Sequence, residues 1–248
     1  MGINHSRIND DSISSPALSG EDKNLRLLQD GKMVSCILMP TGSNYTFITE
    51  IKDDSGMVIR AIYKPKDGEI PLWDFNAGTL YKREYAAYLL SKALGWDFVP
   101  ETVIRDGPYG VGSVQRYVDH ERDTHYQTIR GTHTEELRAI ACFDIMANNV
   151  DRKAVHCFKG CDGRIWGIDH GLTFNHVMKL RTVIWDFWGE PFPVGLQQPM
   201  EEFLQKVDRP SGEVKAVLDL LEPVEVDALI ERVRALVSMG GFPQLRRY

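Results

Sequence analysis

The chain has 248 residues, of which 43% are hydrophobic and 26% are charged, and its formal net charge is −6. This composition is typical of a folded globular protein, and the length suits one large domain or two joined lobes. The acidic balance argues against a broad nucleic-acid footprint. No apolar run of the sequence approaches the roughly 20 residues that span a bilayer. We therefore expect no nucleic-acid partner and no integral membrane association.

Residues 1–20 are rich in Ser, Asn, Asp and Gly and lack the apolar region of a secretory signal. We expect them to form a flexible leader. The four cysteines show neither a disulfide framework nor a common zinc spacing. Reduced thiols suit a cytoplasmic location, which is our expectation for this chain.

Residues 21–118 have the pattern of a β-rich half that contains one helix. Runs rich in apolar and β-branched residues predict strands within 33–40, 44–53 and 57–65. Helical periodicity then predicts a helix over 79–96, with Gly95 at its end, and 98–118 has the pattern of two strands joined by a turn. The first two strands are separated by the turn Thr41-Gly42-Ser43-Asn44.

Residues 119–248 form a mainly helical half with one short β-hairpin. A helix is predicted within 132–149, where Thr132 and Glu135 have the spacing of a capping box. Further helices are expected near 199–207, 211–222 and 224–238. The order of elements therefore predicts an α+β protein of two lobes, with the junction near 117–120.

Lys64 and Glu84 are the first pair of candidate functional residues. Lys64 ends an otherwise apolar strand, where a solvent-exposed edge lysine is the simpler interpretation. Glu84, however, lies on the inward face of the following helix, and a carboxylate there is costly unless it is paired. A lysine held by such a glutamate can present its ammonium group to phosphate oxygens.

Asp151 and Asp169 are the second pair. Asp151 lies in a polar loop after a helix, and Asp169 directly follows the apolar run 165–168. Both positions also suit ordinary turn formers. A carboxylate at the end of a buried strand is a good ligand for Mg²⁺, which takes one or two carboxylates together with substrate phosphates. Asp151 is placed to accept a proton from an attacking hydroxyl.

The order of these motifs resembles that of atypical kinases. A lysine in a strand and a glutamate in the next helix are followed by Asp151-Arg152-x-x-x-His156 and by Ile168-Asp169-His170-Gly171. The set is similar to the phosphatidylinositol 3-/4-kinase-like and HipA-like kinases, in particular their small bacterial relatives. The resemblance runs roughly from Met33 to Phe192. It implies a two-lobed protein-kinase-like fold, with a β-rich N-lobe that contains one helix and a mainly helical C-lobe.

The resemblance also implies a role for each matching residue. Lys64 would contact the α-phosphate of ATP and Glu84 would pair with it, while Asp151 would be the catalytic-loop aspartate and Asp169 the metal ligand. A phosphate loop of Gly42, Ser43 and Asn44 would cover the nucleotide. A hinge of Gln115, Tyr117 and Val118 would hold its adenine.

One position departs from the family pattern. These kinases usually place an asparagine five residues after the catalytic aspartate, and this chain has His156 there. An imidazole is a softer ligand than an amide oxygen. We take Asp169 and His156 as the candidate metal ligands. Three consequences of the histidine stay open: the site uses one Mg²⁺, it prefers Mn²⁺, or the protein is a weakened kinase that mainly binds nucleotide.

We therefore expect an ATP-dependent phosphotransferase that uses Mg²⁺ or Mn²⁺ and phosphorylates a hydroxyl of a protein or small molecule rather than a lipid. Lys179 and Arg181 are near enough to line a site for an anionic acceptor, or they form a solvated basic face. Two alternatives stay open. One is a nucleotide-binding pseudokinase that acts as an interaction module. The other is a metal-dependent hydrolase that uses a histidine and aspartate cluster, namely Asp151, His156, Asp169 and His170.

Overall fold

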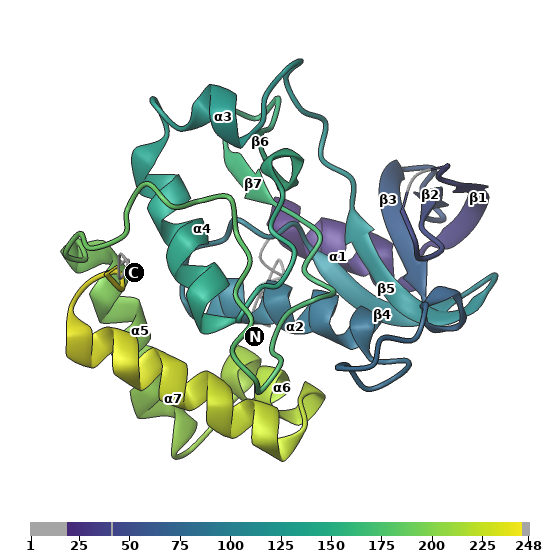
Figure 1. Ribbon diagram of the computed structural model, residues 1–248. Coiled ribbons are helices and arrows are strands. Elements are labelled where there is room, and N and C mark those ends of the chain that lie inside the picture. The colour runs from purple at the N-terminus through teal and green to yellow at the C-terminus, as the bar shows by residue number, and fades with distance from the viewer. Residues whose placement is uncertain (1–18, 41, 245–248) are drawn as a thin grey trace, which may run out of the picture.

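The computed structural model describes residues 19–40 and 42–244 (Figure 1). All but the last two residues of the predicted leader lie outside the described residues, as does Thr41 at the start of the predicted phosphate loop.

A five-stranded antiparallel sheet forms the first half of the structure. Its strands lie in the order β1-β2-β3-β5-β4. They are β1 (Lys32–Leu38), β2 (Phe47–Lys52), β3 (Val58–Pro65), β4 (Thr102–Gly107) and β5 (Gly110–Arg116). In the register of β3 with β5, Lys64 lies opposite Ser113, one residue before the end of β3. Lys64 thus lies at the end of the central strand, where the chain turns away into a short 3-10 helix, Lys66–Gly68.

Two helices accompany the sheet, although the sequence analysis expected one. The expected helix is α2 (Leu80–Ala93), and it contacts β4 and β5. The additional helix is α1 (Gly20–Asp30), which buries Leu27 and Leu28 against the same sheet. A capping box begins α1, because the Ser19 hydroxyl accepts a hydrogen bond from the N–H of Asp22 at 3.1 Å and the Asp22 carboxylate accepts from Ser19.

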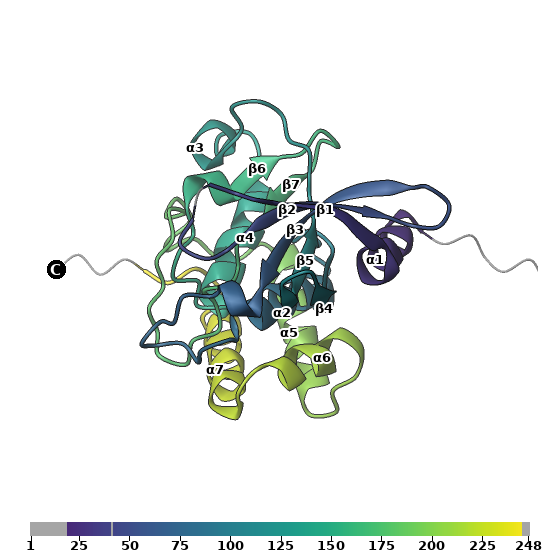
Figure 2. The ribbon, with the colours of Figure 1, turned by 90° about the vertical axis from the view of Figure 1, so that its right-hand side faces the viewer.

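The second half is mainly helical and has one hairpin, as predicted. Its elements are α3 (Tyr126–Ile129), α4 (Thr134–Met146), the 3-10 helix Ala154–His156, the hairpin of β6 (Cys157–Lys159) and β7 (Ile165–Gly167), and helices α5 (Val194–Val207), α6 (Gly212–Leu220) and α7 (Pro223–Met239). In the two ribbon views, α6 and α7 lie on the far side of α2 from strands β1 and β2 (Figures 1 and 2).

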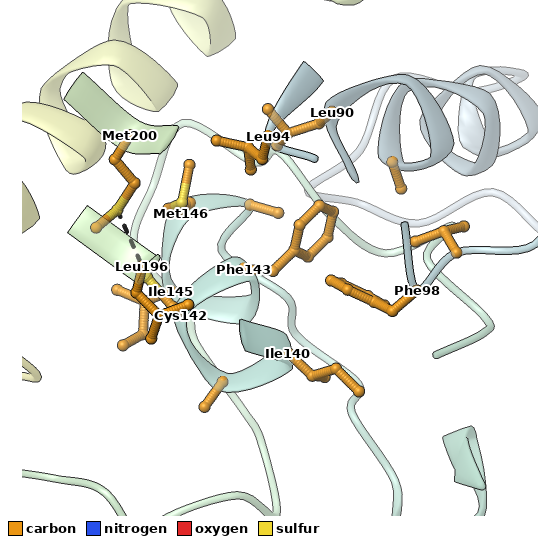
Figure 3. Packing of buried hydrophobic residues seen from close by; sticks show 14 of the residues in the cluster. Leu90, Leu94, Phe98, Ile140, Cys142, Phe143, Ile145, Met146, Leu196 and Met200 are labelled. Carbon is orange, nitrogen blue, oxygen red and sulfur yellow. Dashed lines mark hydrogen bonds between the residues drawn. The ribbon is translucent and has the colours of Figure 1, made fainter. Parts of the chain in front are cut away.

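The largest apolar core surrounds α4 (Figure 3). Phe143 of α4 packs its ring edge-on against Phe98, with 5.1 Å between the ring centres, and Cys142 lies against Met200 of α5. The buried face of α2, including Leu90, belongs to this same core. Helix α2 therefore joins the sheet to the helical half, and the exact division into lobes at residues 118 and 119 stays a prediction.

Among residues 19–40 and 42–244, none of the helices is both long and apolar enough to pass through a membrane.

Candidate active site

Lys64 contacts two of the three predicted acidic site residues, which lie on separate elements. Its Nζ donates to Oε1 of Glu84 on α2 and, at 2.8 Å, to Oδ1 of Asp169, which lies beyond β7. Glu84 and Asp169 are 85 residues apart in the chain, so only the fold brings them together. One ammonium group is therefore held between two carboxylates at the junction of the sheet and the helical half.

Burial explains why Glu84 needs these contacts. Its side chain is only 4% exposed, and an unpaired carboxylate in that position would be costly. Oε1 accepts from Lys64, and Oε2 accepts from the backbone N–H of His170 at 2.9 Å. Glu84 consequently fixes both Lys64 and the backbone that carries Asp169.

The electrostatic environment keeps Lys64 and Asp169 charged. Burial alone would lower the pKa of Lys64, but the negative charges of Asp169 and Glu84 outweigh it and raise that pKa above its ordinary value. The positive charge of Lys64 is the main cause that lowers the pKa of Asp169. The Asp169 side chain is nevertheless 45% exposed, so its carboxylate is accessible to a ligand in the cleft.

The backbone at Asp169 is in the left-handed region, with φ of 62°. Residues other than glycine adopt this conformation rarely, and when they do so it is often at functional sites. In this conformation the Asp169 carboxylate lies within hydrogen-bond distance of Lys64.

His156 is a neighbour of Asp169 and not an isolated side chain. Its Nε2 lies 3.3 Å from Oδ2 of Asp169, and its Nδ1 accepts from the backbone N–H of Lys153 at 3.3 Å. Burial lowers the pKa of His156, which favours a neutral ring. In a neutral ring whose Nδ1 accepts, Nε2 carries the proton, and this N–H group lies beside the Asp169 carboxylate. A metal ligand role for His156 would require that proton to leave, and it stays a prediction.

Asp151 lines one cleft together with Lys64 and Asp169. Each of its two carboxylate oxygens contacts a cationic side chain. Arg181 Nη2 donates to Oδ1 at 2.5 Å, and Lys153 Nζ lies 2.7 Å from Oδ2. Asn149 Oδ1 accepts from the Asp151 N–H at 3.0 Å and holds the loop in place. The two cations are residues that sequence reasoning did not connect with Asp151.

A buried ion pair under the Asp151 loop was also missed. The Arg152 guanidinium donates to Asp144 of α4, and both side chains are fully buried. Arg152 also donates to the carbonyl oxygen of Ile168 at 2.9 Å and contacts Nε2 of His170 at 2.7 Å. Arg152 therefore links α4, the Asp151 loop and the Asp169 turn.

The hydrolase alternative does not fit this arrangement. His170 is fully buried, and its Nε2 faces the Arg152 guanidinium and not the cleft. In the described part of the chain, no three His, Cys, Asp or Glu side chains are grouped so that they could hold a metal ion by themselves.

The cleft has a volume of about 150 Å³. It is lined on one side by the turn with Gly42, Ser43 and Asn44, and on the other by residues of the acidic and basic cluster, including Lys64, Glu84, Asp151, Lys153 and Asp169. Gly42 has a φ of 110°, which a residue with a side chain rarely adopts. The Asn44 Oδ1 accepts from the N–H of Ile70 at 2.7 Å and fixes the end of this turn.

The predicted hinge residues lie outside the lining of this cleft. Gln115 is inside strand β5, and its side chain donates to Thr102 at 2.9 Å. The N–H of Tyr117 donates to the carbonyl oxygen of Arg60 at 2.9 Å, so this donor is already used. Val118 packs with Phe158 and Trp166 beside the hairpin. Contact of this segment with adenine stays a prediction, and it cannot use the Tyr117 N–H in this arrangement.

Comparison with solved structures defines the class of fold. The chain matches the crystal structure of the Golgi casein kinase with a TM-score of 0.53, and the structure of the Golgi casein kinase with Mn/ADP bound with a TM-score of 0.55. Each match covers 88% of this chain and 74% of the other chain at 16% identity. The chain therefore has a kinase-like fold, as the resemblance implied.

The sequence relatives give the particular family. No protein-family model matches the chain. It is 32% identical over 265 residues to Protein Rv2133c of Mycobacterium tuberculosis, across 92% of this chain and 93% of that protein, and it belongs to the same family. It is also 28% identical over 181 residues to Phosphatidylinositol 4-kinase gamma 4 of Oryza sativa. That match covers 57% of this chain and 32% of the plant protein.

Proposed function

We propose that this protein is an ATP-dependent phosphotransferase that transfers the γ-phosphoryl group of ATP to a hydroxyl group. The observation that carries the proposal is the convergence of Lys64, Glu84 and Asp169 in a cleft beside the turn at 42–44. Phosphoryl transfer requires a cation that grips the phosphates and an acidic residue that holds the metal ion, and this cluster supplies both.

Each residue is assigned one role. Lys64, held by Glu84, binds phosphate oxygens of the nucleotide, and Asp169 holds Mg²⁺ or Mn²⁺ together with those oxygens. The metal ion, when bound, neutralises charge on the phosphates. Ser43 and the backbone of Gly42 and Asn44 cover the phosphates. Gln115, Tyr117 and Val118 form the hinge beside adenine.

Asp151 is the residue that receives the proton. The acceptor oxygen forms a bond to the γ-phosphorus while the bond from that phosphorus to the bridging oxygen breaks. ADP leaves with the electron pair, and the proton of the acceptor hydroxyl passes to the Asp151 carboxylate. His156 Nε2 lies 3.3 Å from Asp169 Oδ2, and we assign His156 a role in positioning Asp169 even where it does not ligate the metal.

The finer family assignment is also part of the proposal. The partial match to the plant phosphatidylinositol 4-kinase supports a place near the phosphatidylinositol 3-/4-kinase-like enzymes and gives no comparable support for the HipA-like group. The Mn/ADP bound to a structural neighbour supports nucleotide and divalent metal as the ligands. The four free cysteines suit a cytoplasmic setting.

ADP formation from ATP tests the proposal. We expect the wild-type protein to form ADP with Mg²⁺ or Mn²⁺, and Asp169→Asn to lower the rate by about 100-fold or more. Asp208→Asn, at an exposed position after α5, is the matched control and should leave the rate unchanged. If the wild type forms no ADP with either metal, or if Asp169→Asn behaves like the control, the protein is not this enzyme.

A further inference from the structure

The Asp151 carboxylate has two cations around it and therefore leaves one positive charge in excess. Arg181 contacts Oδ1 and Lys153 contacts Oδ2, so a single negative charge faces two positive ones. Lys64 between Glu84 and Asp169 leaves one negative charge on the other side of the group, so the positive surplus is confined to the surroundings of Asp151. A site of this kind attracts an anion from solution.

The two cations differ from the carboxylate in their exposure. The side chains of Arg181 and Lys153 are 74% and 58% exposed, whereas that of Asp151 is 17% exposed. Ion pairs with such exposed partners contribute little stability, because water solvates the cations almost as well. Arg181 and Lys153 can therefore exchange the carboxylate for another anion at little cost in free energy.

Hydrogen bonds nevertheless hold the backbone and the Nε atom of Arg181 in place. Its backbone N–H donates to Asn149 at 2.9 Å, and its carbonyl oxygen accepts from the N–H of Arg152 at 3.0 Å. Its Nε donates to the carbonyl oxygen of Val150 at 3.0 Å, which leaves the far end of the guanidinium directed at Asp151. An anion bound to Arg181 would therefore lie beside the carboxylate that receives the proton.

We propose, on the basis of the proposed phosphotransferase function, that the acceptor is an alcohol that carries a phosphate or carboxylate group near its hydroxyl, and that Arg181 and Lys153 bind this group. The bound anion takes over the contacts of both cations with Asp151 and frees its carboxylate to take the proton of the hydroxyl. With a neutral alcohol the carboxylate stays covered by the two cations. The site thus selects its acceptor by charge.

Titration with inorganic phosphate, followed by calorimetry on the protein with and without ADP, tests the anion site directly. We expect saturable binding that Arg181→Gln weakens by about tenfold, since hydrogen bonds to charged groups are among the stronger ones. Asp151→Asn should strengthen phosphate binding, because it removes the internal competitor. An increase of this kind would not arise if Arg181 and Lys153 served only to hold the loop together.

Arg234→Gln is the matched control, because Arg234 is an exposed arginine paired with Glu231 on α7, and it should leave the affinity for phosphate unchanged. Glycerol 3-phosphate should compete with phosphate, and glycerol should not. Competition by vesicles of phosphatidylcholine with phosphatidylinositol, but not by phosphatidylcholine alone, would instead identify a lipid headgroup as the source of the anion.

Unchanged phosphate affinity in both Arg181→Gln and Asp151→Asn overturns the inference, as does the absence of phosphate binding in Asp151→Asn. Circular dichroism of each variant checks that the fold is retained. The result is separable from the proposed function, because phosphate binding is read without turnover. A wild type that binds phosphate through Arg181 but forms no ADP contradicts the phosphotransferase proposal and leaves the anion site standing.

Discussion

Glu84 and His170 are joined by a buried hydrogen bond, in which the backbone N–H of His170 donates to Oε2 of Glu84 at 2.9 Å. The other oxygen of the same carboxylate accepts from Lys64. The helix that carries Glu84 therefore fixes both the ammonium group and the turn that presents Asp169. A change in the position of α2 would separate the two groups that are proposed to hold the nucleotide.

Replacing Glu84 by Ala should impair both function and stability. The substitution leaves the N–H of His170 without its acceptor and Lys64 with Asp169 as its remaining partner. We expect a loss of about 1–3 kcal/mol in the free energy of unfolding, the usual cost of an unsatisfied buried polar group. Urea denaturation measures this loss, and ATP binding by calorimetry should weaken in the same variant. Unchanged ATP affinity would show that Glu84 does not position Lys64.

The buried pair of Arg152 and Asp144 should matter more for stability than any surface pair. Asp144→Ala leaves the Arg152 guanidinium buried without a counter-charge, and we expect a loss of about 3–5 kcal/mol. Glu231→Ala, which removes the partner of the exposed Arg234, should cost less than about 1 kcal/mol. Urea denaturation of the two variants at neutral pH compares them, and equal losses would contradict the structural role of Arg152.

Stability should fall as the pH is lowered below about 6.5, the ordinary pKa of histidine. Burial is the main cause that lowers the pKa of His170 well below that value, with the positive charge of Arg152 adding to it. At pH values between the folded-state and the unfolded-state pKa of His170, the unfolded chain binds a proton at this residue and the folded protein does not. Lowering the pH therefore favours unfolding.

Urea denaturation at pH 7.5 and pH 5.5 measures this dependence, and His170→Gln should reduce the difference between the two conditions. His176 is exposed and is the matched control, since His176→Gln should leave the difference as it is in the wild type. If the difference in stability between pH 7.5 and pH 5.5 is the same in His170→Gln as in the wild type, groups other than His170 cause the pH dependence.

ATP should stabilise the protein in a metal-dependent manner. Binding at a hundred times Kd adds about 2.7 kcal/mol to the free energy of unfolding. We expect ATP with Mn²⁺ to raise the Tm, and ATP alone to raise it less. Asp169→Asn should largely remove the rise in Tm with ATP and Mn²⁺. A rise with ATP alone that Mn²⁺ does not increase, together with an absence of ADP formation, would instead favour the nucleotide-binding module.

Sequence patterns predicted the elements that carry strong periodicity or buried charge. The helix expected over 79–96 is α2 at Leu80–Ala93, and the helix expected within 132–149 is α4 at Thr134–Met146. The contact of Lys64 with Glu84 was foreseeable, because a carboxylate on an apolar helix face needs a partner.

Other features depend on contacts that no local pattern reveals. Helix α1 was missed because only two of its residues are buried, and the Thr132–Glu135 cap was wrong because α4 begins at Thr134. The Thr132 hydroxyl instead donates to the carbonyl oxygen of Ile129.

The surroundings of Asp151 and Arg152 were equally hidden in the sequence. Arg181 lies 30 residues from Asp151, and only the fold brings its guanidinium to that carboxylate. The pairing of Arg152 with Asp144 joins the last turns of a helix to a loop, and nothing in the sequence marks these two charges as buried.

A crystal structure with a non-hydrolysable ATP analogue and Mn²⁺ tests most directly whether Lys64 and Asp169 hold the same triphosphate. We expect a Mn²⁺ ion bound by Asp169 and by phosphate oxygens, with Lys64 Nζ within hydrogen-bond distance of the phosphates. A nucleotide bound elsewhere, with the contact between Lys64 and Asp169 still closed, would contradict it.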